Sequence, residues 1–349
     1  MSTPLFFDWH HEPPAHWQQL QTLDMHTGGE PLRVITAGLP ELPGASVLDK
    51  RRYFSRELDH LRRALMWEPR GHADMYGAVL TRSQSADFDV FFLHNEGYST
   101  MCGHAIIALT KLVLETGLHR GAPDAQGLHR ISFQVPAGRV EASARLVDGL
   151  AQQISFVNVP SFVYLAGQRV EVEGLGAVRF DIAYGGAFYA LVEAAPLGLQ
   201  LLPEQQSRLI DAGRRIKQAV MAALTIRHPF EPELGFLYGT IFTGPAQHPA
   251  HHSRNVCIFA DGEVDRSPTG SGVSARAALH HARGELALGE TLCIESILGS
   301  LMTVRVAATE TFGPHAAVRP EVGGSAHYTG RHRFYLDPDD PQGAGFLLR

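Results

Sequence analysis

The sequence predicts an α/β protein built from two similar halves, and three observations lead to that prediction. The chain has 349 residues, a length that suits two domains better than one hydrophobic core. It is 44% hydrophobic and 19% charged, which is typical of globular proteins. The third observation is an order of elements that occurs twice: a strand, a polar residue followed by glycine, an apolar helix, and two strands joined by a glycine-containing turn.

The first half opens with a helical pattern over residues 49–67. Four apolar residues share one side of that segment: Phe54, Leu58, Leu61 and Leu65. Buried strands are then expected at 79–81 and 89–93, and an apolar helix at 105–118. Two alternating strands follow, at 131–135 and 140–144. The polar residue that precedes the helix is Cys102, in the sequence Met101-Cys-Gly-His104.

The second half repeats this order around Thr269, in the sequence Asp265-Arg-Ser-Pro-Thr-Gly-Ser-Gly272. Its expected elements are a strand at 255–260, a helix at 272–282, and strands at 291–296 and 302–307. A separate amphipathic helix is expected at 203–224. We therefore predict a first domain over 21–160 and a second over 161–329. Residues 330–349 are candidates for packing back on the first domain, and residues 1–20 are expected to form a loosely held tail.

Composition excludes several classes of function. The net charge is −6 and basic residues do not cluster, so no nucleic-acid partner is expected. Apolar stretches are too short to span a membrane, and the first residues do not resemble a signal peptide, so we expect a cytoplasmic protein without a membrane partner. The three cysteines are far apart, which predicts neither disulfides nor a metal site. Two of them, Cys257 and Cys293, lie in apolar strands and are expected to be buried structural thiols.

The two polar-glycine motifs have the chemistry of a small-anion site. A helix amino terminus presents unpaired N–H groups and roughly half a positive charge. The amides of Gly103-His104 and Gly270-Ser271 could therefore hold a carboxylate between the two halves. Glycine at these positions would let the backbone approach the ligand closely. Two halves would leave a cleft between them, where small-ligand sites are common.

Side chains beside these amides suggest proton transfer. The helix dipole is expected to lower the pKa of Cys102 and favour a thiolate, which could take a proton from the carbon next to a bound carboxylate. Asp265 is a candidate partner for a ligand ammonium group. A ligand with a carboxylate, an α-hydrogen and an ammonium is an amino acid.

Four segments carry a family resemblance. The sequence resembles the proline racemase family in Met101–His104, Asp265–Gly272, Asp24–Arg33 and Gly185–Tyr189, and the resemblance runs from about Leu23 to the carboxyl terminus. It implies a fold like that of diaminopimelate epimerase, with two pseudo-symmetric α/β domains, each a sheet wrapped around a central helix, and a cofactor-free, metal-free site in the cleft between them. It also implies a homodimer and an imino-acid substrate.

Thr269 departs from the racemase pattern, in which both motifs carry a cysteine. A threonine hydroxyl is far too weak an acid or base to exchange protons with carbon near neutral pH. Family members with this Cys/Thr pairing act as dehydratases, which implies dehydration of trans-3-hydroxy-L-proline to Δ1-pyrroline-2-carboxylate. In that substrate the C3 hydroxyl and the Cα hydrogen lie on the same ring face, so Cys102 could remove the proton and return it to the departing hydroxyl.

Other interpretations remain open at this point. The chain could be a 4-hydroxyproline epimerase or proline racemase, or a degenerate member that only binds an imino acid. A Cys102/His104 peptidase is disfavoured because residues two apart on a helix do not face each other. His104 could assist at the substrate ammonium or be a satisfied core histidine. Four further residues could line the cleft or serve only packing and turns: His26, Glu30, Arg33 and Tyr238.

Overall fold

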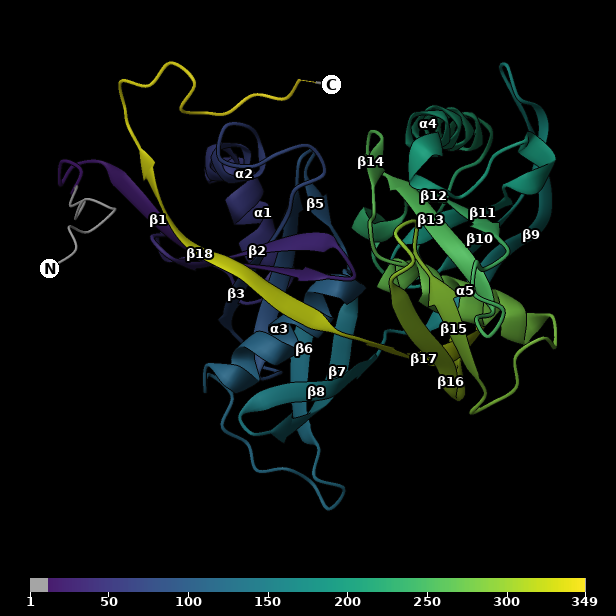
Figure 1. The fold of residues 1–349 in the computed structure, drawn as a ribbon, viewed down its shortest axis with the longest axis horizontal. Helices are drawn as coiled ribbons and strands as arrows, with labels where there is room; N and C mark the ends of the chain where they lie inside the picture. Colours follow the sequence, from purple (N-terminus) through teal and green to yellow (C-terminus); the bar gives the residue numbers. More distant parts are fainter. Residues whose placement is uncertain (1–11, 349) are drawn as a thin grey trace, which may run out of the picture.

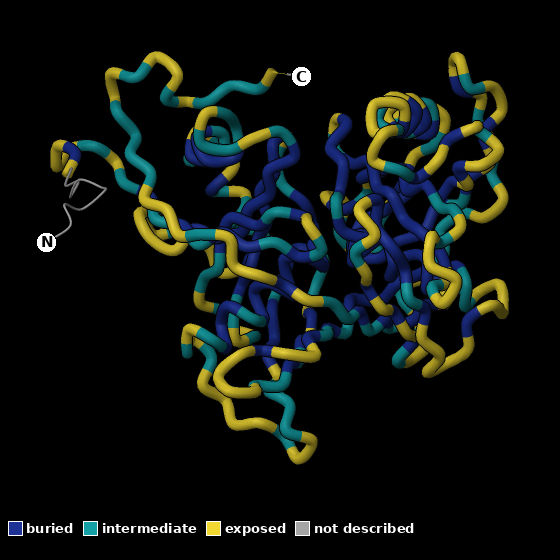
Figure 2. Tube along the Cα trace, viewed as in Figure 1, coloured by how far each residue is buried: buried dark blue, intermediate teal, exposed yellow. Residues whose placement is uncertain are grey.

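A computed structural model describes residues 12–348. Two halves lie side by side, and in each of them the strands curve around one central helix (Figure 1). The central helices are α3 (Gly103–Glu115) and α5 (Gly270–Ala282), and nearly all of their residues are buried. The buried segments gather in the middle of each half, and exposed segments lie mainly in the loops (Figure 2). The fold is the two-domain α/β arrangement that the motifs imply.

The elements of each half follow the chain in order. The first half contains β1 (Gln18–Thr27), β2 (Glu30–Ala37), α1 (Val47–Glu57), α2 (Asp59–Met66), β3 (Tyr76–Arg82), β4 (Phe88–His94), β5 (Tyr98–Ser99), α3, β6 (His129–Val135), β7 (Gly138–Val147) and β8 (Leu150–Val157). The second half contains β9 (Ser161–Val172), β10 (Gly176–Tyr184), β11 (Phe188–Glu193), α4 (Gln206–Ala223), β12 (Leu237–Gly244), β13 (Ser253–Phe259), β14 (Glu263–Val264), α5, β15 (Thr291–Glu295), β16 (Leu301–Phe312) and β17 (His315–Gly324). Short 3₁₀ turns occupy Ala195–Leu197, Pro203–Gln205 and Pro232–Leu234.

Strand pairing repeats between the halves. In the first half β2 pairs parallel with β3, β3 antiparallel with β4, and β4 parallel with β6. In the second half β11, β12, β13 and β15 pair in the same order and with the same directions. Helices α3 and α5 are the crossovers of the two parallel pairs, β4–β6 and β13–β15. This repeat places Cys102 and Thr269 at equivalent positions, one residue before each central helix.

The last strand ties the halves together. Strand β18 (Ala326–Leu336) leaves the second half and pairs antiparallel with β1 of the first half, as the yellow strand in Figure 1 shows. Strand β17 pairs with β8 of the first half as well as with β9 and β16. The halves are therefore joined by continuous sheet pairing in addition to side-chain packing.

Two local expectations were wrong. The helical pattern over 49–67 is split at Leu58, whose backbone leaves helical geometry at φ −123° and ψ 11°, so that α1 and α2 each pack separately against β4. The tail expected over 1–20 includes residues 18–20, which belong to β1 because they pair with residues 334–336 of β18. Residues 1–11 lie outside the described part of the chain. Within residues 12–348, no helix combines the length and the apolar character needed to cross a membrane.

Candidate active site

The amino termini of α3 and α5 meet at the boundary between the halves, and a narrow cavity of about 20 Å³ lies there. All seven residues singled out from the two motifs line it: Cys102, Gly103, His104, Asp265, Thr269, Gly270 and Ser271. Seven further residues complete the lining: Glu30, Tyr76, Met101, Tyr189, Tyr238, Cys257 and Phe259.

Gly103 and Gly270 touch each other across the boundary. A Cβ on Gly103 would lie 2.6 Å from the Cα of Gly270, and a Cβ on Gly270 would lie 2.7 Å from the Cα of Gly103. Real Cβ atoms essentially never approach backbone so closely, so any side chain here would force the two helices apart. Glycine at these positions therefore lets the two helix termini meet, and their free amides converge on one cavity.

We expect Gly270→Ala to lower kcat/KM by about 10²-fold or more, since a shift of about 1 Å in a reactive constellation has an effect of that size. Crowding should also lower the free energy of unfolding by about 1–3 kcal/mol. Gly330→Ala is the matched control, because its Cβ would approach only the side chain of His332. Steady-state kinetics and thermal melts measure both effects, and full activity in Gly270→Ala would contradict this account of the contact.

The Cys102 sulfur faces His104, contrary to the expectation from their spacing. The distance from Cys102 Sγ to His104 Nδ1 is 3.1 Å. The spacing argument fails because Cys102 is not in the helix: it is the N-cap of α3, with extended backbone at φ −145° and ψ 105°. The extended backbone of Cys102 lets its side chain lie over the first turn of α3, which contains His104.

The protonation of His104 follows from its two neighbours. Its Nε2 lies 3.2 Å from the carbonyl oxygen of Pro31, which can only accept a hydrogen bond. Burial lowers the pKa of His104 to about 3, although the Pro31 carbonyl opposes that shift. The ring is therefore neutral, and we assign its proton to Nε2. Nδ1 is then left to accept a hydrogen bond from the Cys102 thiol.

The buried side chain of Cys102 is a thiol and not the expected thiolate. Burial raises the pKa of Cys102 well above its ordinary value, although the Ala105 N–H and the Tyr76 hydroxyl oppose that shift by favouring the anion. The negative charge of Asp265 raises the pKa of Cys102 further, as a charge on Glu30 would. The expectation of a lowered pKa was wrong because it counted the helix dipole alone. Desolvation by the surrounding core outweighs the dipole here.

Alkylation by iodoacetamide tests this protonation state. The thiolate is the reactive form, and a raised pKa means that its fraction grows tenfold with each pH unit up to that pKa. The alkylation rate of Cys102 should therefore keep rising through the neutral range and above it. Mass spectrometry locates the label, and the Cys102→Ser variant identifies labelling at Cys257 and Cys293. An alkylation rate that no longer changes with pH in the neutral range would show that Cys102 is a thiolate there, as first expected.

Thr269 is held in a strained backbone conformation. Its φ of 67° and ψ of 93° lie in a region that β-branched residues rarely adopt. The Ser267 side chain accepts a hydrogen bond from the Thr269 N–H at 3.1 Å, and the Asn255 side-chain amide donates to the Pro268 carbonyl at 3.0 Å. Among the described residues the buried Oγ1 of Thr269 has no partner at hydrogen-bond distance, although it lies near enough to lower the pKa values of Asp265 and Cys257. Strain and an unsatisfied hydroxyl are typical of functional positions.

Two buried carboxyl groups face the cavity, and only one of them was expected there. Asp265 accepts a hydrogen bond from the Ser267 N–H at 2.8 Å, and Glu30 accepts one from the Arg266 N–H at 2.7 Å. Burial raises the pKa of both, and the negative charge of Asp265 raises the pKa of Glu30 further. The sequence did not decide whether Glu30 reaches the cleft, because Asp24–Arg33 shows no helix terminus or periodicity that would place its side chain.

These carboxylates and His104 form a compact donor cluster. Glu30, His104 and Asp265 offer ligand atoms that all lie within 4.8 Å of one another. Such a set could coordinate a metal ion or receive a ligand ammonium. Either cation would favour ionisation of the two carboxyl groups.

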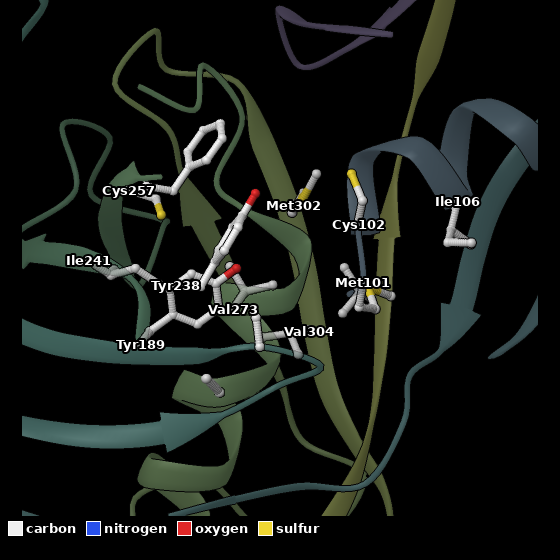
Figure 3. Close-up of a cluster of buried hydrophobic side chains, with 14 of the residues drawn as sticks. Met101, Cys102, Ile106, Tyr189, Tyr238, Ile241, Cys257, Val273, Met302 and Val304 are labelled. Carbon is white, nitrogen blue, oxygen red and sulfur yellow. The ribbon is translucent and has the colours of Figure 1, made fainter. Parts of the chain in front are cut away.

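Aromatic and sulfur side chains from the second half form the opposite wall. Figure 3 shows Cys102 immediately before α3, and Tyr189, Tyr238 and Cys257 on the facing side. The Tyr189 hydroxyl lies 2.7 Å from Ser271 Oγ, and the Tyr238 ring stacks on Phe259 with 5.4 Å between centroids. Cys257 is buried, as expected, but its position in the cavity wall was not foreseen.

The remaining candidates lie elsewhere. Arg33 forms an internal ion pair with Asp24, with 2.8 Å between Nη2 and Oδ2. His26 accepts a hydrogen bond from the Gly29 N–H at 3.2 Å and so fixes the turn between β1 and β2. The structural interpretation therefore holds for both, and of the open candidates only Glu30 and Tyr238 reach the cavity.

Comparison with known proteins places the chain among imino-acid enzymes. The family model described as proline racemase matches residues 22–347. A trans-3-hydroxy-L-proline dehydratase of Colwellia psychrerythraea is 52% identical over 95% of this chain and 93% of its own. The Homo sapiens protein of the same name is 47% identical over 95% of each chain. A Burkholderia multivorans relative, 45% identical over 95% of this chain and 99% of its own, is named 3-hydroxyproline 2-epimerase.

A solved structure shares the whole fold. The hydroxyproline epimerase of Agrobacterium vitis, crystallised with trans-4-hydroxy-L-proline, is 32% identical, with a TM-score of 0.87 over 95% of this chain and 96% of its own. The similarity covers both halves and therefore the cavity between them.

Proposed function

This chain belongs to the proline racemase family, and we propose that it is a hydro-lyase that dehydrates trans-3-hydroxy-L-proline to Δ1-pyrroline-2-carboxylate. The single observation on which this proposal depends is the pairing of Cys102 with Thr269 at the two meeting helix termini. One side of the cavity offers a sulfur base, and the other offers an alcohol. The names of the Colwellia and human relatives support the same reaction.

The cavity can bind every charged group of this substrate. The amides of Gly103-His104 and Gly270-Ser271 hold the carboxylate at the two positive helix ends. Asp265 receives the ring ammonium. Between these anchors the substrate Cα faces Cys102 on one side and Thr269 on the other.

Substrate binding also prepares the base. The negative charge of Asp265 raises the pKa of Cys102, and a bound ammonium offsets it. The thiol can then release its proton to solvent as the substrate binds, while His104 Nδ1, 3.1 Å away, orients the sulfur. The thiolate then removes the Cα hydrogen, and the helix amides stabilise the charge that spreads into the carboxylate. Loss of the C3 hydroxyl gives an enamine, which tautomerises to the product without a cofactor.

Elimination needs one face of the substrate, whereas inversion needs two. The Cα hydrogen and the C3 hydroxyl of trans-3-hydroxy-L-proline both lie on the face opposite the carboxylate, so Cys102 can reach both in turn. Racemisation requires a proton donor on the other face, and the hydroxyl of Thr269 is too weak an acid. This asymmetry favours dehydration.

Incubation with three substrates tests the proposal. Trans-3-hydroxy-L-proline should give Δ1-pyrroline-2-carboxylate, while trans-4-hydroxy-L-proline and L-proline should be recovered without inversion. Chiral chromatography and mass spectrometry identify the products. A folded protein that L-proline stabilises thermally but that converts none of the three would be an imino-acid-binding protein instead.

One observation favours an epimerase as the second candidate. Cys257 provides a second sulfur in the cavity wall close to Thr269, and the Burkholderia multivorans relative carries an epimerase name. Reaction in heavy water separates the two candidates, because two-base epimerisation labels Cα in an inverted product. Burial raises the pKa of Cys257, and this opposes a role for it as a thiolate.

We also propose a cytoplasmic homodimer. Cys102 must stay reduced to act as a base, and the three cysteines are free in the structure. A reducing compartment suits that requirement. Analytical ultracentrifugation measures the oligomeric state.

A further inference from the structure

Glu30 is a cavity residue to which the reaction above assigns no proton transfer. It begins β2 of the first half, it is 0% exposed, and it lines the same cavity as Cys102. Its Oε2 accepts a hydrogen bond from the Arg266 N–H at 2.7 Å. Its Oε1 is buried and has no hydrogen-bond partner among residues 12–348. A buried carboxyl oxygen without a partner requires an explanation.

The surroundings favour the neutral acid. Glu30 and Asp265 lie in one buried cluster, and two carboxylates so close share a proton more readily than they both ionise. Asp265 is the better anion, because the Ser267 N–H donates to it at 2.8 Å and the nearby Ser267 and Thr269 side chains lower its pKa. Glu30 receives one backbone N–H and lies deeper, so the proton resides on Glu30. Since Oε2 accepts from Arg266, the proton lies on Oε1.

We propose that Glu30 is a catalytic acid, which delivers the Oε1 proton to the departing C3 hydroxyl while Cys102 retains the proton that it took from Cα. This inference rests on the proposed dehydration. It replaces the simpler scheme in which one sulfur performs both transfers.

The position of Glu30 matches the geometry of the substrate. The hydroxyl leaves from the same ring face as the Cα hydrogen, the face that Cys102 approaches. Glu30 belongs to that side, because the carbonyl of the next residue, Pro31, lies 3.2 Å from Nε2 of His104, and Nδ1 of that ring lies 3.1 Å from Cys102 Sγ. Glu30, the acid, and Cys102, the base, therefore both lie near the imidazole of His104.

The protons and electrons balance. The thiolate forms an S–H bond as the Cα–H bond breaks, and that electron pair becomes the double bond between Cα and C3. The C3–O bond breaks, and the oxygen takes the Glu30 proton to leave as water. The enzyme is left with a Cys102 thiol and a Glu30 carboxylate. Uptake of one proton by Glu30, equal to the one that Cys102 released as the substrate bound, restores the free enzyme with its Cys102 thiol.

Two other roles would place Glu30 in the cavity. It could share the ring ammonium with Asp265, or it could act only as an anchor between the halves through the Arg266 N–H. Neither role depends on the identity of the leaving group, whereas a catalytic acid does. Hydroxide needs a proton to leave, and fluoride needs one far less.

The test compares trans-3-hydroxy-L-proline with trans-3-fluoro-L-proline in the full-length enzyme. Glu30→Gln keeps the size of the side chain and an acceptor for the Arg266 N–H, but it cannot give up a proton. Loss of water should slow by about 10²- to 10⁴-fold, the range of general acid catalysis, while loss of fluoride slows less than about tenfold. Asp265→Asn is the control for ammonium binding and should slow both eliminations equally.

Equal losses for both substrates in Glu30→Gln, or no loss for either, would overturn the assignment. Thermal stabilisation by L-proline checks that the variant folds and binds. If Glu30→Gln fails to fold or bind, Glu30→Asp provides the test, because it keeps an acid but withdraws it by one methylene. The rate of water loss divided by the rate of fluoride loss should then fall below the wild-type value. An unchanged ratio would refute the role of Glu30 as an acid. A wild-type enzyme that eliminates neither group refutes the proposed function itself, which separates the two failures.

Discussion

Replacing Cys102 by serine is expected to reduce kcat/KM for trans-3-hydroxy-L-proline by about 10⁴-fold, the upper end of what a positioned base contributes. The serine hydroxyl occupies the same N-cap position before α3, but it is a much weaker acid than the thiol and forms no useful anion near neutral pH. His104 Nδ1 would remain without a thiol proton to accept. The measurement is the appearance of Δ1-pyrroline-2-carboxylate under steady-state conditions.

Cys293→Ser is the matched control for that variant. Cys293 lies in β15, is only partly buried, and is not among the residues that line the cavity. We expect its activity to stay within about threefold of wild type, as for surface changes away from special features. Melting temperatures should be similar for both variants. Turnover by Cys102→Ser at a tenth of the wild-type rate would remove Cys102 from the mechanism.

Replacing Thr269 by cysteine should produce the opposite kind of effect, the gain of a reaction. A second thiol before α5 would face the substrate from the side opposite Cys102, at the equivalent position of the other half. We expect inversion at Cα of trans-4-hydroxy-L-proline and L-proline, seen by chiral chromatography and by deuterium at Cα of the inverted product in heavy water. Dehydration should remain within about tenfold of wild type, because removing a group that is not a base costs little of the general-base contribution.

Two controls fix the interpretation. Thr269→Ser keeps a hydroxyl and should give no inversion, although it removes the β-branch from a residue at φ 67°. The double variant with Cys102→Ser should lose inversion and dehydration together. A folded, dehydrating Thr269→Cys enzyme that inverts none of the imino acids would show that the alcohol is not what prevents racemisation.

The repeated motifs predicted a duplicated α/β unit and the meeting of Cys102 with Thr269, and the family resemblance implied the fold of each half. Each motif combines a polar residue, a glycine and an apolar helix, and local sequence encodes that combination directly. The N-cap conformation of Cys102 was the exception. Helical spacing predicted that Cys102 and His104 point apart, but a residue just outside a helix is not bound by that spacing, and the two atoms lie 3.1 Å apart.

The pKa values and the long-range contacts of the site residues could not be predicted from the sequence. The helix dipole is visible in a local pattern, whereas the desolvation that raises the pKa of Cys102 comes from strands of both halves. Glu30 reaches the cavity because the β1–β2 turn brings it to the Arg266 N–H of the other half, 236 positions along the chain. Sequence reasoning had no signal for that contact.

The sequence by itself determined which groups are present, where the helices begin, and that one base is a thiol while its counterpart is an alcohol. Tertiary structure alone decided the protonation of those groups and the membership of Glu30, Tyr238 and Cys257 in the site. The physical reason is that backbone patterns act over a few residues, while burial and charge act through space. In a cavity formed between two halves, burial and charge therefore control the protonation of the reactive groups.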